Sequence, residues 1–308
     1  MQEHDHLEDH DRGLNHDLEV MATRTLARRK LLSLFAVGGT GALIAACGGG
    51  GSSSTGTTST ASTTTTTTTT GTTTTGTTTT TTGTTTTSSC VADPTETNGP
   101  YPSDGTNTVS GVVSNSLTTS GVVRSDIRSS FGSYSGTADG VLLTLKVKVV
   151  NTNSSCANLS GYAVYVWHCD ALGRYSLYSS GVTSQNYLRG VQVTDSNGEV
   201  TFTTVWPACY DGRWPHIHFE IFPSLATATT QRNATLTSQF AMPSAVCTTI
   251  YNGSSLYSAS ISNFAKVSVT TDGVFGDNTT AQIAAMTPTV TGSLSAGYAA
   301  TVTVGVAV

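Results

Sequence analysis

The stretch His216-Ile217-His218-Phe219-Glu220-Ile221-Phe222 decides the fold, because polar and apolar residues alternate along it. A period of two is typical of a β-strand that has one face in the core. We therefore expect Ile217 and Phe219 to point into the core, and His216 and His218 to project from the opposite face. Their separation along the strand is about 7 Å, so both imidazoles can reach one cation. By itself the pattern equally fits two histidines on a polar face.

Other segments after Cys90 carry the same kind of signal, since they are short, rich in Val, Thr, Tyr, Phe and Ile, and separated by turn sequences. No stretch shows sustained helical periodicity. We predict one all-β domain over residues 90–308, an antiparallel or mixed β-sandwich. Its further strands are expected at Gly140–Val150, Tyr162–Cys169, Glu199–Trp206, Phe264–Thr271 and Ala299–Val308.

The segment 21–47 is predicted to be a bacterial signal peptide. Its basic start is followed by an apolar run that is short for a membrane span. The pair Arg28-Arg29 resembles a twin-arginine export signal, although an ordinary basic region remains the alternative. The sequence before Cys47 resembles a lipobox, so Cys47 is expected to be acylated. The protein is then an exported lipoprotein that faces the periplasm or the cell exterior.

Residues 48–89 are almost entirely Thr, Gly and Ser, a composition that buries no core and predicts a disordered linker. Residues 1–20 are rich in His and acidic residues and precede a signal that is complete without them. We interpret them as a mis-called start or a cleaved extension, with a metal-binding tract as the alternative.

Charge excludes one class of partner. Only 11% of the residues are charged, the formal net charge is −5, and no charged residue occurs between 31 and 89. Binding of a nucleic-acid backbone requires a basic face or stripe, which a weakly acidic domain lacks. We therefore expect no nucleic-acid partner.

Several motifs occur in a fixed order along the domain. They are Thr97–Tyr101, Val123–Ile127, Trp167–Ser176, Leu188–Asp195 and Trp206–Pro215, the last leading directly into His216. In this order they resemble the intradiol ring-cleavage dioxygenases, the family of catechol and protocatechuate dioxygenases. The resemblance covers nearly all of residues 90–308 and is greatest to the protocatechuate-type core, because no helical segment precedes the predicted sandwich.

The resemblance implies a non-haem Fe(III) site whose ligands are Tyr175, Tyr210, His216 and His218. The chemistry of these residue types fits that metal. A tyrosine has an ordinary pKa of about 10, so at neutral pH it becomes a phenolate only when a strong Lewis acid replaces its proton. Hard anionic oxygen ligands favour ferric over ferrous iron.

The family's reaction is also implied. A catechol-type aromatic diol binds, Tyr210 leaves the metal and takes up a substrate proton, and O2 is inserted between the two hydroxylated carbons to give a muconate-type diacid. Arg213 matches the family's arginine that stabilises negative charge on the substrate. Gln239 matches a glutamine near the oxygen-binding side. Gly99, Pro100 and Tyr101 match a segment of the substrate pocket.

Four polar residues near these motifs receive no ligand role. His168 is expected in the core or behind the ligands, since it matches a family position that supplies none. Asp170, Arg174 and Arg189 are candidates for ordering the loop that carries Tyr175.

The domain contains five cysteines, which cannot all pair within one chain: Cys90, Cys156, Cys169, Cys209 and Cys247. Whichever one is left over, three pairings of the other four compete, and the sequence does not choose among them. Cys209 stands where relatives tend to carry an aromatic residue, so we expect a change in the pocket wall there.

Two other functions compete with ring cleavage. One is a secreted β-sandwich binding module, transthyretin-like or carbohydrate-binding, without turnover. The other is a zinc or copper enzyme that uses the two histidines, for which two tyrosine partners are unusual. A binding module has no need for two tyrosines, two histidines and an arginine in these motifs, and this combination favours the dioxygenase.

Overall fold

The computed structural model describes residues 90–308. The predictions for the first 89 residues, namely the extension 1–20, the signal peptide with Cys47 and the linker, lie outside the described residues. Within the described part of the chain, no helix has the length and apolar character needed to cross a membrane.

A four-stranded antiparallel sheet carries most of the motif residues, in the strand order β6-β5-β8-β9. Its strands are β5 (Ala163–Trp167), β6 (Arg189–Val193), β8 (His216–Phe222) and β9 (Leu236–Ala241). The predicted strands around β5 and β8 are confirmed, and β8 begins and ends at the predicted residues. Strands β6 and β9 were not predicted, because β6 begins with Arg189-Gly190 and β9 contains the polar run Thr237-Ser238-Gln239.

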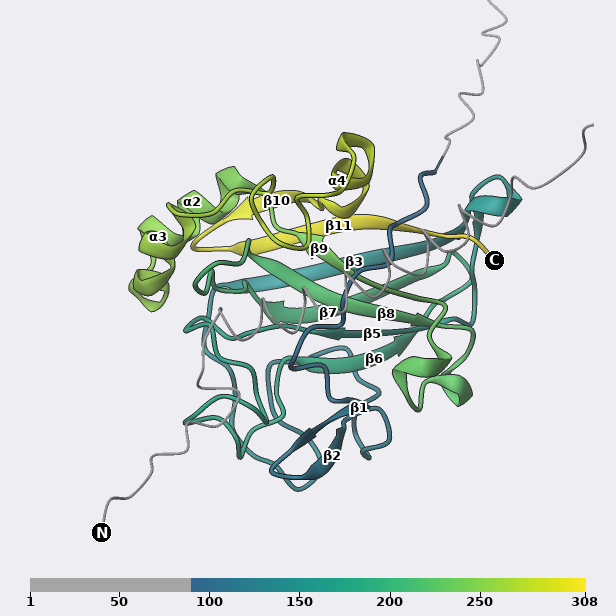
Figure 1. The fold of residues 1–308 in the computed structure, drawn as a ribbon, viewed down its shortest axis with the longest axis horizontal. Helices are drawn as coiled ribbons and strands as arrows, with labels where there is room; N and C mark the ends of the chain where they lie inside the picture. Colours follow the sequence, from purple (N-terminus) through teal and green to yellow (C-terminus); the bar gives the residue numbers. More distant parts are fainter. Residues whose placement is uncertain (1–89) are drawn as a thin grey trace, which may run out of the picture. The chain divides into compact units, whose positions relative to one another are not determined.

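A five-stranded mixed sheet forms the second layer (Figure 1). Strand β11 runs parallel to β3, and the remaining pairs are antiparallel. The predicted mostly-β architecture is therefore confirmed, with strands of both directions in one sheet. The strands are β3 (Leu142–Asn151), β4 (Ala157–Asn158), β7 (Glu199–Val205), β10 (Thr289–Ser293) and β11 (Gly297–Val306).

One hydrophobic core joins the two sheets. Leu145 and Val147 of β3 and Ile217 and Phe219 of β8 are fully buried in it. The ring of Phe219 stacks on that of Phe240 with the ring centroids 4.3 Å apart. Since side chains alternate along β8, the histidines lie on the opposite face of the four-stranded sheet. The predicted division of the strand into an apolar and a histidine face is confirmed.

Three short helices lie in the C-terminal part of the chain: α2 (Ser244–Gly253), α3 (Ser258–Phe264) and α4 (Thr280–Met286). Figure 1 shows α2 and α3 at the far end of the molecule from the small hairpin of β1 (Asp104–Val109) and β2 (Val112–Asn115). Single turns of 3-10 helix complete the fold: η2 (Thr152–Ser154), η3 (Leu225–Thr227), η4 (Gln231–Asn233) and η5 (Ser255–Tyr257).

The strand predicted at Phe264–Thr271 is wrong. Phe264 ends α3, and the following residues form turns in which the amides of Thr271 and Asp272 both donate to the carbonyl of Ser268. The β-branched residues suggested a strand, but Val267 and Val269 pack instead on a small cluster around Trp214. Tertiary packing therefore overrides the local preference.

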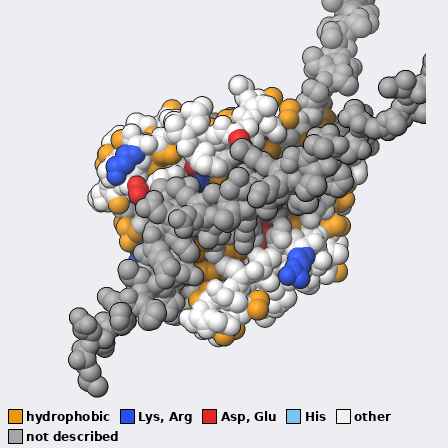
Figure 2. All heavy atoms as spheres, viewed as in Figure 1, with side chains coloured by type: hydrophobic (Ala, Val, Ile, Leu, Met, Phe, Trp, Pro, Cys, Tyr) orange, Lys and Arg blue, Asp and Glu red, His pale blue; other side chains and the backbone are white. Residues whose placement is uncertain are grey.

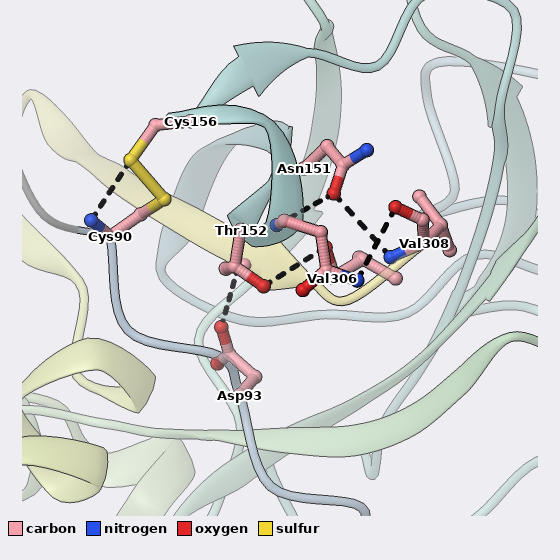
Figure 3. Close-up of a disulfide and its surroundings, with 9 residues drawn as sticks. Cys90, Asp93, Asn151, Thr152, Cys156, Val306 and Val308 are labelled. Atoms are coloured by element: carbon pink, nitrogen blue, oxygen red, sulfur yellow. Dashed lines mark hydrogen bonds between the residues drawn. A yellow bond between two sulfur atoms is a disulfide. The ribbon is translucent and has the colours of Figure 1, made fainter.

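The start of the described chain is fastened to its end (Figure 3). Cys90 and Cys156 form a disulfide, whereas Cys169, Cys209 and Cys247 are buried free thiols. The open question of cysteine pairing is thus resolved with one bridge. Asp93 lies three residues after Cys90. Its amide donates to the carbonyl oxygen of Gly305, and its Oδ2 accepts a hydrogen bond from the Gly305 amide at 2.7 Å. Both links hold the segment that continues to Gly99 and Tyr101.

Candidate active site

The site is built on the face of the four-stranded sheet that points away from the core. His218 of β8 is paired with Trp167 of β5 and with Gln239 of β9, so these three side chains share that face. The indole of Trp167 stacks on the imidazole of His218 at 4.8 Å, with only 9° between the ring planes. All three residues are buried. The sheet thus supplies a rigid platform for the second histidine.

His216 has its ring orientation fixed by the backbone. Its Nδ1 is 2.5 Å from the carbonyl oxygen of Trp214, which can only accept, so Nδ1 carries the proton. The Nε2 atom is left with a lone pair, as a metal ligand requires. The hydroxyl oxygens of Tyr175 and Tyr210 lie 3.2 Å and 3.3 Å from this Nε2. Two phenols and one imidazole therefore converge on one point.

Tyr175 lies in the loop after β5, and the buried Asp170 stabilises the conformation of this loop. Oδ1 of Asp170 accepts the amides of Leu172 and Arg174, and its Oδ2 forms an ion pair with the Arg174 guanidinium at 2.8 Å. A Cβ at Gly173 would lie 3.1 Å from Cβ of Tyr210, so glycine allows the two tyrosine loops to touch. Asp170 and Arg174 order the Tyr175 loop as the sequence suggested.

The two tyrosines differ in exposure. Tyr175 is buried, with 2% of its surface exposed, whereas Tyr210 is half-buried. Their rings meet edge to face, with the centroids 5.9 Å apart. The rings of His216 and His218 are 4.8 Å apart and nearly perpendicular. The structure thus brings the four predicted ligands together from two loops and one strand.

Burial dominates the electrostatics of this cluster. Desolvation, followed by the nearby Arg213 charge, lowers the pKa of His216 to about 3. Desolvation, followed by electrostatic repulsion from a protonated His216, lowers the pKa of His218 well below its ordinary value, because the two rings could not both carry a proton charge. Both imidazoles are therefore neutral at pH 7, the form that binds metals. Burial also raises the pKa of Tyr175 well above its ordinary value, so its phenol keeps its proton unless a Lewis acid displaces it.

These donors fit a ferric ion. Within residues 90–308, no cluster of three or more His, Cys, Asp or Glu side chains is suited to a metal. A metal at this site would therefore depend on tyrosine oxygen, which is hard and anionic when ionised and favours Fe(III). Nδ1 of His218 is buried without a hydrogen-bond partner, so this imidazole is held by packing on Trp167.

Arg213 lies beside the cluster and is buried, with 1% of its surface exposed. Its Nε donates to Oδ2 of Asp272 at 2.9 Å, and its Nη2 donates to Oε1 of Gln239 at 2.8 Å. Nη1 is buried without a partner. The predicted pair of Arg213 and Gln239 is thus in direct contact, and one N–H-bearing nitrogen remains for a ligand. Their catalytic roles stay predictions.

The predicted pocket segment Gly99–Tyr101 also reaches the cluster. Gly99 has a φ of +71°, and a Cβ there would lie 3.1 Å from Cε1 of His218, so only glycine suits this close approach. The ring of Tyr101 is 5.0 Å from that of Tyr175. The segment therefore borders the ligand cluster, while its contact with a substrate stays a prediction.

Arg189 joins the pocket segment to the Tyr175 loop. Its guanidinium donates to the carbonyl oxygens of Tyr101 and Pro102 at 2.8 Å and 2.9 Å. On its other side it donates to the hydroxyl and carbonyl oxygens of Ser176 at 3.1 Å and 3.0 Å. This buried arginine orders the Tyr175 loop, and it also anchors the pocket segment, a role the sequence did not suggest.

Two neighbouring side chains lie behind the site. His168 uses both ring nitrogens, with Nδ1 2.8 Å from the Cys169 carbonyl and Nε2 2.7 Å from Oγ1 of Thr204, so neither is left for a metal. Cys209 packs in the core, with its thiol 3.4 Å from the carbonyl oxygen of Arg213. It lies behind the Tyr210 backbone, and the expected change in the pocket wall therefore stays a prediction.

Sequence reasoning missed two buried acids. Asp272 holds Arg213 in a buried ion pair, and its Asp-Gly dipeptide by itself indicates only a turn. Glu220 follows His218 by two residues on the same face of β8, and burial, reinforced by Asp104, raises its pKa well above the ordinary value. Glu220 is two residues from His218 and four from His216, and this spacing in a strand indicates that it lies on the histidine face.

Comparisons with known proteins find a similar family and a similar fold. Residues 125–250 match a family model described as Dioxygenase. An intradiol ring-cleavage dioxygenase from Tetranychus urticae has a similar structure, with a TM-score of 0.52 and 23% identity over 71% of this chain and 95% of that one. No match was found among curated proteins. Residues 125–250 thus resemble the dioxygenase family model, and the fold is similar to that of the Tetranychus urticae enzyme.

Two further solved structures are similar with lower scores. The dioxygenase domain of a dioxygenase and carbohydrate-binding protein fusion from a Streptomyces species has a TM-score of 0.41 and 22% identity, over 71% of this chain and 99% of that one. A 3-chlorocatechol 1,2-dioxygenase from Rhodococcus opacus has a TM-score of 0.41 and 17% identity, over 70% and 73%. The resemblance to intradiol ring-cleavage dioxygenases that the motifs indicated is confirmed by the family-model match and by the Tetranychus urticae structure.

Proposed function

We propose that this protein is an Fe(III)-dependent intradiol dioxygenase that cleaves a catechol-type ring between its two hydroxylated carbons. Both atoms of O2 enter the product, a muconate-type diacid, so no external reductant is needed. The observation that carries the proposal is the convergence of the Tyr175 and Tyr210 hydroxyls on Nε2 of His216, with His218 alongside.

The four ligands would hold the metal without further protein donors. Ferric iron bound there supplies Lewis acidity that stabilises the phenolates and draws electron density from a bound catechol. His216 and His218 contribute neutral nitrogen, since burial keeps both imidazoles uncharged. Tyr175 is buried and serves as the fixed anion. Tyr210 is more exposed, and its phenolate oxygen would accept a proton from an incoming catechol hydroxyl.

Arg213 would stabilise charge on the substrate. Asp272 and Gln239 hold two edges of the guanidinium, and Nη1 has no partner in the protein. A buried, preoriented cation stabilises a developing negative charge more strongly than water does. The segment Gly99–Tyr101 closes the other side of the cluster, where it can pack on the aromatic ring.

A direct experiment combines metal analysis with oxygen uptake. The purified full-length protein should hold about one iron per chain, show a reddish visible band from phenolate-to-iron charge transfer, and consume one O2 for each catechol cleaved. A screen of catechol, protocatechuate, hydroxyquinol and chlorinated or lignin-derived catechols identifies the substrate. Colourless protein that gains no band on adding ferric iron would contradict the proposal.

We also propose that the protein acts outside the cytoplasm as a lipoprotein anchored through Cys47. The Cys90–Cys156 disulfide supports this, because disulfides persist in oxidising compartments. Replacing Arg28 and Arg29 by lysine should retain the protein in the cytoplasm. Cys47→Ala should permit export but release the protein from membranes. Cell fractionation that finds both variants at the wild-type location would contradict this proposal and leave the iron chemistry untouched.

A further inference from the structure

Asp272 is a fixed buried carboxylate beside the site. It lies in the turns between α3 and α4, 59 residues after Arg213, and 2% of its surface is exposed. Its Oδ1 accepts the amides of Val274 and Phe275 at 2.8 Å and 3.0 Å. These hydrogen bonds stabilise the turn that contains Asp272. They also fix the position of its carboxylate independently of its contacts with other parts of the chain.

One branch of its contacts leads to Arg213. Oδ2 accepts Nε of Arg213 at 2.9 Å, and Oδ1 lies 3.5 Å from Nη2. Oε1 of Gln239 accepts a hydrogen bond from Nη2 on another edge of the guanidinium. Because the group is planar and its donors are rigidly arranged, two contacts on different edges set its orientation. The free Nη1 is therefore aimed by Asp272 and Gln239 together.

A second branch leads to His216 through one residue, Trp214. Oδ2 of Asp272 also accepts the amide of Trp214 at 2.7 Å, and the carbonyl of Trp214 is the acceptor for Nδ1 of His216. Hydrogen bonds behind a metal-binding histidine fix its ring and increase the basicity of its other nitrogen. The carboxylate thus reaches both a candidate metal ligand and the candidate charge-stabilising residue.

We propose that Asp272 is a positioning residue that aligns Arg213 and His216 at once, an inference that rests on the proposed ring-cleavage function. It touches neither metal nor substrate and acts through its two neighbours. Through Arg213 it aims Nη1, and through Trp214 it sets the ring of His216. A displacement of about 1 Å in such groups lowers turnover on the order of a hundredfold.

The test variant is Asp272→Asn, which keeps the size of the side chain and removes its charge. We expect kcat per bound iron to fall ten- to a hundredfold, with KM changed less than threefold and the visible band shifted. The matched control is Asp126→Asn, because Asp126 also pairs with an arginine but is 48% exposed. It should change kcat less than twofold, since exposed ion pairs contribute little.

A double-mutant cycle separates positioning from a merely structural role. In an Arg213→Leu background, Asp272→Asn should lower kcat by a much smaller factor than in wild type, because only the branch through Trp214 to His216 remains. The same double variant should still differ from Arg213→Leu in its visible band, through the Trp214 branch. Independent, multiplicative losses of kcat would overturn the Arg213 branch, and an unchanged band would overturn the His216 branch.

Two controls cover a variant that does not fold and a failure of the proposed function. If Asp272→Asn alone does not fold, Arg213→Leu/Asp272→Asn removes both buried charges, and its band is then compared with that of Arg213→Leu. Wild-type protein in the same assays reports on the proposed function itself. Wild type without iron and turnover would refute ring cleavage, whereas active wild type with an unaffected Asp272→Asn variant would refute only the positioning role.

Discussion

Replacing Arg213 by leucine tests the electrostatic part of the account. The substitution removes the cation whose Nη1 is buried without a protein partner, while leucine keeps part of the apolar volume. Loss of one preorganised charge-stabilising group from an active site costs about 2.7–4 kcal/mol, on the order of 10²- to 10³-fold in kcat. Because Arg213 is not among the ligands, the variant should retain its iron and colour.

Steady-state oxygen uptake, normalised to bound iron, measures the effect. Arg213→Leu also leaves Asp272 as a buried anion without its cation, so thermal unfolding must confirm that the variant is folded under the assay conditions. Arg128→Leu is the control, because it removes an arginine that is 40% exposed and pairs with Asp126. A kcat within about twofold of wild type, worth less than about 0.5 kcal/mol, would refute the role of Arg213.

Three other predictions concern the ligands and the stability of the fold. His216→Ala or His218→Ala should lose most of the bound iron by metal analysis, and full iron content in both variants would contradict the ligand assignment. Replacing Cys90 and Cys156 by serine should lower the free energy of unfolding by about 4 kcal/mol at most, the value for a loop of this length, in denaturant titrations; an unchanged midpoint would argue against the bridge. Burial raises the pKa of Asp93 from 3.8 to about 7, so its protonated form is the one that folding favours. The contribution of Asp93 to the free energy of unfolding is therefore full below about pH 4 and declines as the pH rises to about 7. In a plot of the free energy of unfolding against pH, Asp93→Asn should flatten the part between these values.

Local sequence pattern was sufficient for the parts of the site that lie within one element. The spacing of His216 and His218 sets both side chains on one face of a strand, and the structure has them there. Tyr175 and Tyr210 are 35 residues apart, in loops with no periodicity, and only the family motifs indicated that they meet. Their convergence depends on tertiary contacts such as that between Gly173 and Tyr210.

Other features were beyond local reasoning because tertiary contacts determine them. Asp272 directly follows a segment whose valines favour a strand, yet its carboxylate is buried against Arg213 from a turn. The disulfide joins Cys90 to Cys156 because the first described segment runs along β11, where Asp93 pairs with Gly305. Neither contact leaves a periodic signal in the sequence. Both require the path of the chain in three dimensions.

The most direct test of the central claim is iron analysis of the full-length protein, with visible spectra recorded before and after anaerobic addition of a catechol. We predict about one ferric ion per chain and a tyrosinate-to-iron band that shifts when the catechol binds, followed by loss of the catechol once O2 is admitted. A protein that remains colourless after incubation with ferric iron, or that binds zinc with no visible band and leaves every catechol intact, would contradict the account.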